Sequence, residues 1–265
     1  MIKKIASRQN PLVARYREAA RGETPDVLLI DGVHLVAEAL AAGMRIRHAA
    51  VKSDVMNITE IGALVDKLTR SNVDVVAVSA SVMDALSPLR SPSTFVALAD
   101  RPDVSEAAVY RDDALVVIAI DVQDPGNVGA IVRVAEAGGA TGVIAAGASA
   151  NPFGWKALRG SMGSALRLPL LVRSDADRAV ADARARGCRI VATAPRGGRS
   201  LADVALSGPV AILIGGEGPG LPPSLIDGAD DRVTIPMQPP VESLNAAVTA
   251  ALIVYEARRQ RSGRA

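Results

Sequence analysis

Short apolar runs alternate with amphipathic stretches along most of the chain, and this alternation predicts strands separated by helices. The first part of the pattern begins at Val27 and ends at Ala99. Its expected elements, in order, are the strand VLLI, a helix over 33–42, the strand IRHAAV, a helix over 58–69, the strand VDVVAV, a short helix around Val82 and the strand TFVALA. We therefore expect a small α/β unit in this part of the chain.

A second and longer α/β pattern starts with the strongly apolar run ALVVIAI. Its expected elements are strands over 115–120, 142–145, 167–172, 189–193, 210–214 and 232–235, with helices over 127–137, 175–186 and 244–260. Near-continuous apolar strands are typical of a mostly parallel sheet covered by helices on both faces. The polar segment Pro102–Asp113 separates the two patterns, so we divide the chain into residues 1–100, a linker over 101–113, and residues 114–265.

Three segments rich in glycine or proline follow expected strands of the second unit. DPGN leads from the first strand into a helix, GGEGPGL follows the strand VAILI, and IPMQPPVESLN leaves the last strand. The first segment carries G-x-x-G, and it matches neither the G-x-G-x-x-G dinucleotide fingerprint nor a Gly-Lys-Ser/Thr phosphate loop. Because ligands of parallel α/β sheets bind beyond the carboxyl ends of the strands, we expect the three segments to form one site.

Most residues of these segments also have an ordinary structural explanation. Asn127 is typical of a helix cap, and an exposed Arg133 is typical of an outer helix. Ser243 is a sound N-cap for the last helix, with Asn245 in its first turn. GGEGPGL is harder to explain as a linker, since its glycines let the backbone approach a ligand while Glu217 is held on a stiff loop. It lacks lysine, which favours a ligand bound by backbone amides and apolar walls, such as the adenosine of a sulfonium cofactor.

Composition places the chain among soluble globular proteins. Hydrophobic residues make up 49% of its 265 residues, and no apolar run approaches the roughly 18 residues that a membrane-spanning helix needs. The first ten residues lack the apolar stretch of a signal peptide, so we expect a cytoplasmic protein. The single cysteine, Cys188, excludes an internal disulfide and a thiolate metal cluster, and we expect it to fill space in the core.

The net charge of +2 conceals basic segments at both ends of the chain. Residues 1–21 carry six lysines and arginines against Glu18, and residues 256–265 carry four arginines against Glu256. Both ends are candidates for contact with a polyanion. The alternative is a frayed, solvated terminus at each end.

Few residues suit acid–base, metal or stacking chemistry. The only histidines, His34 and His48, lie in the first unit, so a nucleophile–His–acid triad is not supported. Asp121 and Asp124, like Glu217, are not spaced as a metal cage. Aromatic residues make up only 2% of the chain, which counts against base stacking of the RRM or OB-fold kind. We expect the aromatic cluster around Trp155 to pack in a core.

Three motifs of the second unit resemble the SPOUT superfamily of RNA methyltransferases, in its SpoU/TrmH branch. They are DPGNVGAIVRVAEAGG at 124–139, IGGEGPGL at 214–221 and IPMQPPVESLNAAVTA at 235–250, and the resemblance covers about residues 114–260. The first unit is similar, more loosely, to the substrate-binding domain that often precedes this fold, through SRQNPLV at 7–13 and LLIDGVHLVAEALAAG at 28–43. Asp31 stands where that domain usually has Glu, and LRSPSTFVALA replaces its usual Thr-Pro-Gln-Gly segment.

The resemblance implies a fold, an activity and an assembly. The fold is a SPOUT-type, mostly parallel α/β sheet with a C-terminal trefoil knot, preceded by a small L30e-like α/β domain that binds RNA; the knot follows from the resemblance alone. The activity is transfer of a methyl group from S-adenosylmethionine, without a metal, to a ribose 2′-hydroxyl of RNA, with ribosomal RNA favoured over transfer RNA. The assembly is a homodimer with its sites near the subunit interface, away from membranes.

Two sets of residues carry over from the family by position. Those expected to hold S-adenosylmethionine are Gly215, Gly216, Gly218, Ile235, Met237 and Leu244, with Thr193 as a weaker candidate. Those expected on the reaction side are Asn127, Arg133, Glu217, Ser243 and Asn245. Because a guanidinium stays protonated, we interpret Arg133 as a clamp on the adjacent phosphate and a stabiliser of the developing alkoxide, not as a general base. The two asparagines then orient these groups, and the glutamate fixes the glycine loop or a guanidinium.

Two other functions explain part of the pattern. A non-catalytic RNA-binding or ribosome-assembly factor would keep this fold without the reaction, but the five intact reaction-side residues count against it. A dinucleotide-dependent oxidoreductase explains the strand, turn and helix over 115–137 but not the other two loops. Methyl transfer is therefore the leading hypothesis.

Overall fold

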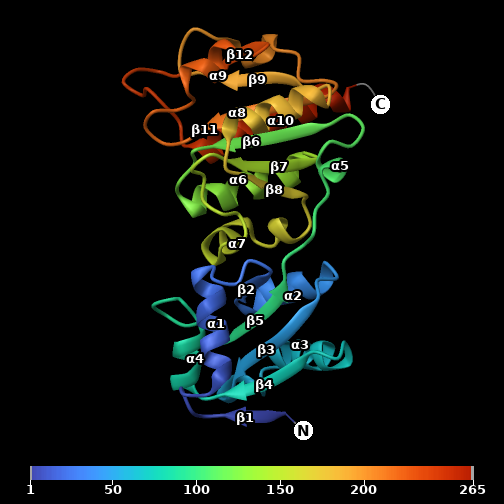
Figure 1. The fold of residues 1–265 in the computed structure, drawn as a ribbon, viewed down its shortest axis with the longest axis vertical. Coiled ribbons are helices and arrows are strands. Elements are labelled where there is room, and N and C mark those ends of the chain that lie inside the picture. Colours follow the sequence, from blue (N-terminus) through green and yellow to red (C-terminus); the bar gives the residue numbers. More distant parts are fainter. Residues whose placement is uncertain (1, 264–265) are drawn as a thin grey trace. The chain divides into compact units, whose positions relative to one another are not determined.

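The structure is a computed structural model that describes residues 2–263 (Figure 1). The chain forms two compact units. The first consists of Met1–Asp103 together with Phe153–Arg159, and the second of Val104–Pro152 together with Gly160–Ala265. Residues 153–159 thus belong to the first unit although their neighbours in sequence belong to the second. No pattern in the sequence indicates this exchange.

The first unit is built on a five-stranded sheet. Its strands, in sheet order, are β1 (Lys3–Ile5), β4 (Asp74–Val78), β3 (Ile46–Lys52), β5 (Phe95–Asp100) and β2 (Val27–Asp31). Its helices are α1 (Pro11–Arg21), α2 (Val33–Ala41), α3 (Thr59–Arg70), α4 (Ala80–Leu86) and the first residues of α7 (Trp155–Ser161). Strand β5 runs antiparallel to both of its neighbours, β3 and β2, whereas β4 runs parallel to β1 and β3. The elements expected between residues 27 and 99 are all present.

The basic segment 1–21 contains two elements that the sequence pattern did not predict, β1 and α1. Helix α1 starts where the Asn10 side chain accepts the Leu12 N–H at 3.0 Å, with Pro11 in the first turn, and it ends at Gly22 with φ 73°. One face of α1 is buried, including the whole of Tyr16. The alternative of a frayed N-terminus is therefore wrong for residues 2–21.

A buried polar pair, Tyr16 and His48, joins α1 to β3. The Oη of Tyr16 lies 2.9 Å from Nδ1 of His48, and Nε2 of His48 lies 3.7 Å from Oδ2 of Asp74. Burial lowers the pKa of His48 from 6.5 to about 4, while Asp74 opposes the shift and Arg15 adds to it. His48 is therefore neutral at physiological pH.

We expect the first unit to lose stability as the pH falls from 6.5 towards 4. The unfolded chain takes up the imidazole proton near pH 6.5, whereas the folded unit takes it up near pH 4, so the contribution of His48 is complete above pH 6.5. Between pH 6.5 and pH 4 the unfolding free energy should fall by about 3 kcal/mol as this contribution is lost. In His48→Gln the unfolding free energy should depend less on pH. Urea titrations followed by the fluorescence of Trp155, which packs against this core, measure the effect, and equal pH slopes in both proteins would contradict it.

The second unit contains a seven-stranded parallel sheet. Its strands, in sheet order, are β10 (Arg199–Ser200), β12 (Asp231–Thr234), β9 (Arg189–Thr193), β11 (Val210–Gly215), β6 (Leu115–Ile120), β7 (Gly142–Ala146) and β8 (Leu170–Arg173). Its helices are α5 (Glu106–Val109), α6 (Pro125–Gly138), α8 (Ala176–Ala185), α9 (Pro223–Asp227), α10 (Ala246–Ser262) and the end of α7. The predicted, mostly parallel α/β sheet is confirmed, whereas the trefoil knot stays a prediction.

Helices α6 and α10 pack closely against each other. A Cβ atom on Gly138 would lie 2.2 Å from Cγ1 of Val254, so the approach of the two helices requires glycine at this position. Elsewhere in this unit, Cys188 is 4% exposed and belongs to a core cluster. Burial raises the pKa of its thiol, as expected for a cysteine that fills space in the core.

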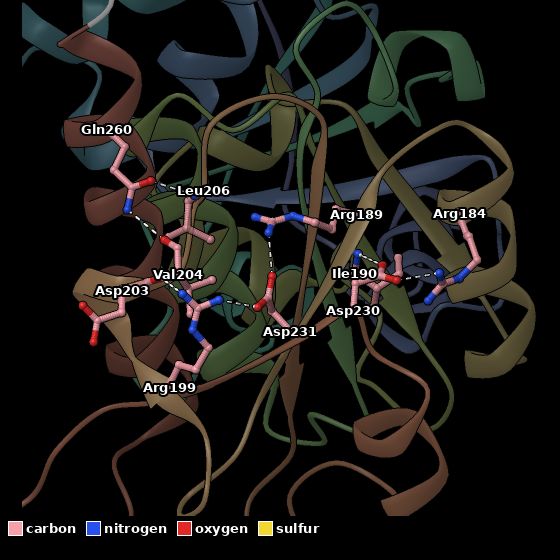
Figure 2. A network of polar contacts seen from close by, with 10 residues as sticks. All are labelled: Arg184, Arg189, Ile190, Arg199, Asp203, Val204, Leu206, Asp230, Asp231 and Gln260. Atoms are coloured by element: carbon pink, nitrogen blue, oxygen red, sulfur yellow. Dashed lines mark hydrogen bonds and ion pairs between the residues drawn. The ribbon is translucent and has the colours of Figure 1, made fainter.

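Figure 2 shows a polar network that fixes β12 beside its neighbours. The carboxylate of Asp231 bridges Arg189 at the start of β9 and Arg199 at the start of β10. The adjacent Asp230 pairs with Arg184 of α8 at 2.8 Å. These contacts join the amino ends of β9, β10 and β12 and so support the register of these strands. The loops described below lie at the opposite, carboxyl ends of the strands.

Helix α10 holds the C-terminal arginines against the second unit. Arg258 donates to the backbone carbonyl of Ala137, and Arg259 pairs with Glu256. Arg261 donates to the backbone carbonyls of residues 113, 114, 206 and 208. A frayed terminus is therefore wrong for residues 256–262, and much of the charge expected to meet a polyanion is engaged within the unit. The fourth arginine of this segment, at position 264, lies outside the described residues.

Candidate active site

The carboxyl ends of four neighbouring strands lie at one edge of the parallel sheet. Gly215 at the end of β11 pairs with Ile120 at the end of β6, and Thr193 at the end of β9 pairs with Val233 of β12. The three glycine- and proline-rich segments predicted to form a site therefore leave the sheet at the same edge. They cover residues 121–124, 216–222 and 235–245.

The side chain of Asn127 links these three loops. Its Nδ2 donates to Oε1 of Glu217 on the glycine loop, and its Oδ1 accepts from Nδ2 of Asn245 at 3.0 Å. The two partners are 90 and 118 residues away along the chain. Asn127 is half-buried, whereas Glu217 and Asn245 are exposed, so this network opens to solvent. The structure thus brings together three of the five reaction-side residues.

The start of α6 explains why Asn127 is available for these contacts. Asp124, not Asn127, caps the helix, since its Oδ1 accepts the Asn127 N–H at 2.9 Å, and Pro125 occupies the first helical position. The ordinary explanation of Asn127 as a cap is therefore wrong. Its amide group is directed at other loops instead of its own backbone.

The start of α10 also differs from the prediction. We expected Ser243 to cap a helix starting at residue 244, but α10 starts at Ala246 and Asn245 is its cap. The Oδ1 of Asn245 accepts the N–H groups of Ala247 at 2.9 Å and Val248 at 3.3 Å. Asn245 has the extended backbone that a cap requires, and its Oδ1 takes up two N–H groups at the helix start. One asparagine therefore starts the helix with its oxygen and contacts Asn127 with its nitrogen.

The glycine loop 215–221 is packed against neighbouring backbone. A Cβ atom on Gly216 would lie 2.0 Å from the carbonyl oxygen of Asp121, and one on Gly215 would lie 2.5 Å from the backbone of Gly220. Gly218 and Gly220 have φ values of 89° and 70°, in the left-handed region that favours glycine. The close approaches and the positive φ values explain the glycines of GGEGPGL. The packed loop holds Glu217 on a defined turn.

Asp121 is a residue that the sequence pattern did not assign to the site. It has φ 56°, which is uncommon outside glycine, and its Oδ1 accepts the Ala148 N–H at 2.7 Å. Its carbonyl oxygen meets the backbone of Gly216, so it joins the loop before α6 to the glycine loop. Backbone strain of this kind is concentrated at functional sites. The available signal was an aspartate directly after a buried strand.

Five of the other predicted site residues lie at the same edge without a hydrogen bond to the Asn127 network. Half-buried Ile235, Met237 and Leu244 lie in the loop that leaves β12, and Ser243 is exposed there. Thr193 donates its hydroxyl to a carbonyl of β11. A sixth residue, the exposed arginine at position 133 on α6, forms no hydrogen bond or ion pair with any residue in the described part of the chain.

Exchanging donor and acceptor between Asn127 and Glu217 tests this network. We expect Asn127→Asp to lower the rate of the methyl transfer that the resemblance implies about 10-fold, because two carboxylates then face each other and a charge-assisted hydrogen bond is lost. Adding Glu217→Gln should restore most of the rate, because the new amide can donate to the new carboxylate. Steady-state kinetics of the single and double variants measure the coupling. If the double variant is slower than either single variant, the rate does not depend on the hydrogen bond between residues 127 and 217.

Comparisons with known proteins identify the family. A family profile described as SpoU rRNA Methylase family matches residues 114–255, and one described as MRM3-like substrate binding domain matches residues 15–97. The first match alone covers more than half of the chain. The chain belongs to the SpoU rRNA methylase family. This membership confirms the predicted relationship to SpoU/TrmH proteins. It also confirms the prediction that the protein is an RNA methyltransferase.

Two curated relatives of this SpoU family protein match nearly their whole length. An uncharacterised tRNA/rRNA methyltransferase of Synechocystis, slr1673, is 31% identical over 98% of this chain and 94% of its own. The 23S rRNA (guanosine(2553)-2'-O)-methyltransferase RlmP of Bacillus subtilis is 29% identical over 97% of this chain and 100% of its own.

Two solved structures of SpoU proteins contain the methyl donor. The AdoMet-bound rRNA methyltransferase from Sinorhizobium meliloti has a TM-score of 0.84 and 27% identity, covering 97% of this chain and 98% of its own. AviRb from Streptomyces viridochromogenes, in complex with AdoMet, has a TM-score of 0.83 and 28% identity, covering 95% and 98%. These complexes support S-adenosylmethionine as the cofactor of this SpoU protein.

The residues at the sheet edge fit this cofactor. A nucleoside needs backbone polar groups and apolar surface, and the edge offers the glycine loop and the half-buried Ile235, Met237 and Leu244. Among residues 2–263, no group of three or more His, Cys, Asp or Glu side chains is placed to hold a metal ion. No helix in the same range is long and apolar enough to cross a membrane.

Proposed function

We propose that this protein methylates a ribose 2′-hydroxyl of ribosomal RNA, with S-adenosylmethionine as the donor. The observation that carries the proposal is the Asn127 network, which joins three loops distant in sequence at one edge of the sheet of a SpoU family chain. Ribosomal RNA is favoured because RlmP is named as a 23S rRNA enzyme and the Sinorhizobium protein as an rRNA methyltransferase. Residues 1–100, which contain the whole match to a substrate-binding domain, would bind the RNA.

The cofactor supplies a methyl group on a positively charged sulfur, which is a good leaving group. In our proposal the glycines at 215, 216 and 218, with Ile235, Met237 and Leu244, hold its nucleoside, and Thr193 borders them. The Asp121–Gly216 contact and the Asn127–Glu217 hydrogen bond fix the shape of this cradle. The chain contributes mainly by alignment of the reacting oxygen with the methyl group.

We assign the charge stabilisation to Arg133. Its guanidinium is exposed and unpaired within the described residues, so it is available to a phosphate and to the developing alkoxide of the RNA. A protonated guanidinium is a poor proton acceptor, so Arg133 acts as a hydrogen-bond donor in this scheme. Asn245 and the exposed Ser243 border the space in which the ribose would lie.

Methyl transfer from tritiated S-adenosylmethionine tests the proposed function. Ribosomal RNA from cells that lack the protein should accept label, and mapping of ribose methylation should find one mark missing in those cells and restored by the purified protein. Transfer RNA from the same cells is the comparison substrate. Binding of ribosomal RNA without label incorporation would instead identify a non-catalytic RNA-binding factor, and label in transfer RNA alone would change the substrate.

We also propose that the protein is a homodimer through α10. Val248, Leu252 and Tyr255 are 47%, 43% and 49% exposed, and their spacing places them on one face of the helix. An exposed apolar stripe next to the Asn245 cap is typical of a protein–protein contact surface near the site.

A charge on this stripe should separate the subunits. We expect Leu252→Arg to convert a dimer to a monomer in light scattering, because an unpaired guanidinium would be buried at the contact. Leu252→Met is the control, since it keeps an apolar side chain of similar volume. A wild-type protein that is already monomeric at micromolar concentration would refute the assignment.

A further inference from the structure

A buried carboxylate ends strand β2 in the first unit. Asp31 is 1% exposed. Its Oδ2 accepts the Ser87 hydroxyl at 2.7 Å, and its Oδ1 accepts the Ser93 hydroxyl and Nη1 of Arg159 at 3.1 Å. Arg159 belongs to the part of α7 that is grouped with this unit. A single carboxylate thus gathers donors from the chain segments that precede β5 and from α7.

Two of these three donors lie in the loop 87–94, which connects α4 to β5. The hydroxyl oxygen of Ser87 also accepts the backbone N–H of Leu89 at 3.4 Å and of Ser93 at 3.3 Å. Pro88 and Pro92 reduce the conformations open to the unfolded loop. The loop contains no helix or strand, so its shape depends on these contacts.

Stability alone is a poor explanation for this arrangement. Desolvation of a buried charge offsets much of the gain from its partners, so a buried ion pair is weak evidence for a stabilising role. Asp31 fixes an irregular surface loop, and loops held by a rigid scaffold are where binding residues concentrate. The fixed loop is therefore suited to presenting a side chain to a ligand.

That side chain is Arg90, which is exposed and lies in the middle of the loop. Several other arginines of the unit are engaged in ion pairs, including Arg8 with Asp84 and Arg45 with Asp100. Arg90 forms no hydrogen bond or ion pair with another residue in the range 2–263. A guanidinium held on a fixed loop, with its donors free, is suited to a phosphate group.

We propose that the loop 87–94 selects the RNA substrate through a contact between Arg90 and a backbone phosphate, and that Asp31 is the positioning residue that holds the loop. A fixed guanidinium favours RNAs whose fold places a phosphate at the matching position. The inference rests on the proposed function, because it requires RNA as the substrate.

The first experiment measures binding of 23S rRNA, transcribed in vitro, to the full chain at several salt concentrations. In Arg90→Ala we expect the dissociation constant to rise about 10-fold. In a plot of log Kd against log salt concentration, the slope should fall by about one, as expected for the loss of one phosphate contact. Arg45→Ala is the matched control, because it also removes an arginine side chain, in this case one that is 85% exposed. Arg45 precedes β3, at the end of the sheet opposite to the loop 87–94, so this variant should change neither the dissociation constant nor the salt slope. An unchanged salt slope in Arg90→Ala, or equal effects of both variants, would overturn the proposal.

The second experiment tests the positioning role. Asp31→Asn should weaken binding of the same RNA and speed amide exchange of Leu89 and Ser93, while the dissociation constant for S-adenosylmethionine stays within twofold. In the Asp31→Asn background, Arg90→Ala should have a smaller effect than in the wild type, because the guanidinium is no longer held in place. If Asp31→Asn does not fold, Ser93→Ala removes one loop contact instead. Full additivity of the two substitutions would overturn the role of Asp31.

The two proposals fail in different ways. If the wild-type protein methylates ribosomal RNA but Arg90→Ala and Asp31→Asn bind RNA normally, only the loop proposal is lost. If the wild type transfers no methyl group to RNA, the proposed function is lost first.

Discussion

Arg133→Ala should reduce methyl transfer to RNA by about 10²- to 10³-fold, the loss typical of removing one donor that stabilises a developing oxyanion. The side chain is exposed and has no partner in the described part of the chain, so the melting temperature should stay within experimental error. Binding of S-adenosylmethionine, measured by calorimetry, should also stay close to the wild-type value. Single-turnover kinetics with saturating RNA separate this loss of rate from a loss of RNA affinity.

Two further variants sharpen this prediction. Arg133→Lys keeps the charge but replaces a planar, forked donor by a point donor, so we expect an intermediate rate. Arg178→Ala removes an exposed arginine of α8 in the same unit and should leave the rate unchanged. Our assignment of Arg133 fails if its alanine variant is as active as the Arg178 variant.

Gly216→Ala should weaken binding of S-adenosylmethionine and lower the melting temperature together. The added Cβ would lie 2.0 Å from the carbonyl oxygen of Asp121, and because that atom belongs to the backbone, one of the two loops must move. Overpacking of this kind costs about 1–3 kcal/mol, which corresponds to roughly 5- to 150-fold in affinity if it falls on the cofactor site. Calorimetric titration and thermal unfolding with and without the cofactor measure both effects.

The control for this prediction is Gly187→Ala. Gly187 has φ 80°, and a Cβ atom added there would have no neighbouring heavy atom within 4 Å, so alanine adds backbone strain without a clash. We expect a stability loss of about 1 kcal/mol and normal cofactor affinity. If Gly216→Ala behaves in the same way, the close approach to Asp121 does not shape the cradle.

Much of the fold followed from the sequence because hydrophobic periodicity is a strong local signal. The runs that became β6 and β11 are almost wholly apolar, as expected of strands buried on both faces. Helix α1 was missed, although Asn10 and Pro11 form a recognisable start, because its arginines suggested a solvated terminus. The grouping of residues 153–159 with the first unit had no signal, since only tertiary packing determines it.

The candidate site was predictable in its location but not in its detailed contacts. Parallel strands bring their carboxyl ends to one edge, so the meeting of the three loops followed from topology. The residue that caps α10 could not be predicted in this way, because Ser243 and Asn245 are both good capping residues and the loop geometry decides between them. Asp121 was missed for a similar reason, since a left-handed backbone at a non-glycine residue depends on its neighbours in space.

The exchange of Phe153–Arg159 into the first unit determines how the protein can be dissected. A recombinant fragment that ends at Asp103 would lack Trp155, which packs against its core, and Arg159, which neutralises Asp31. Its buried aspartate would lose a charged partner, and an apolar patch would be left open to water. Such a truncation would therefore be prone to aggregate, and RNA recognition by this unit is best studied by substitutions in the intact polypeptide.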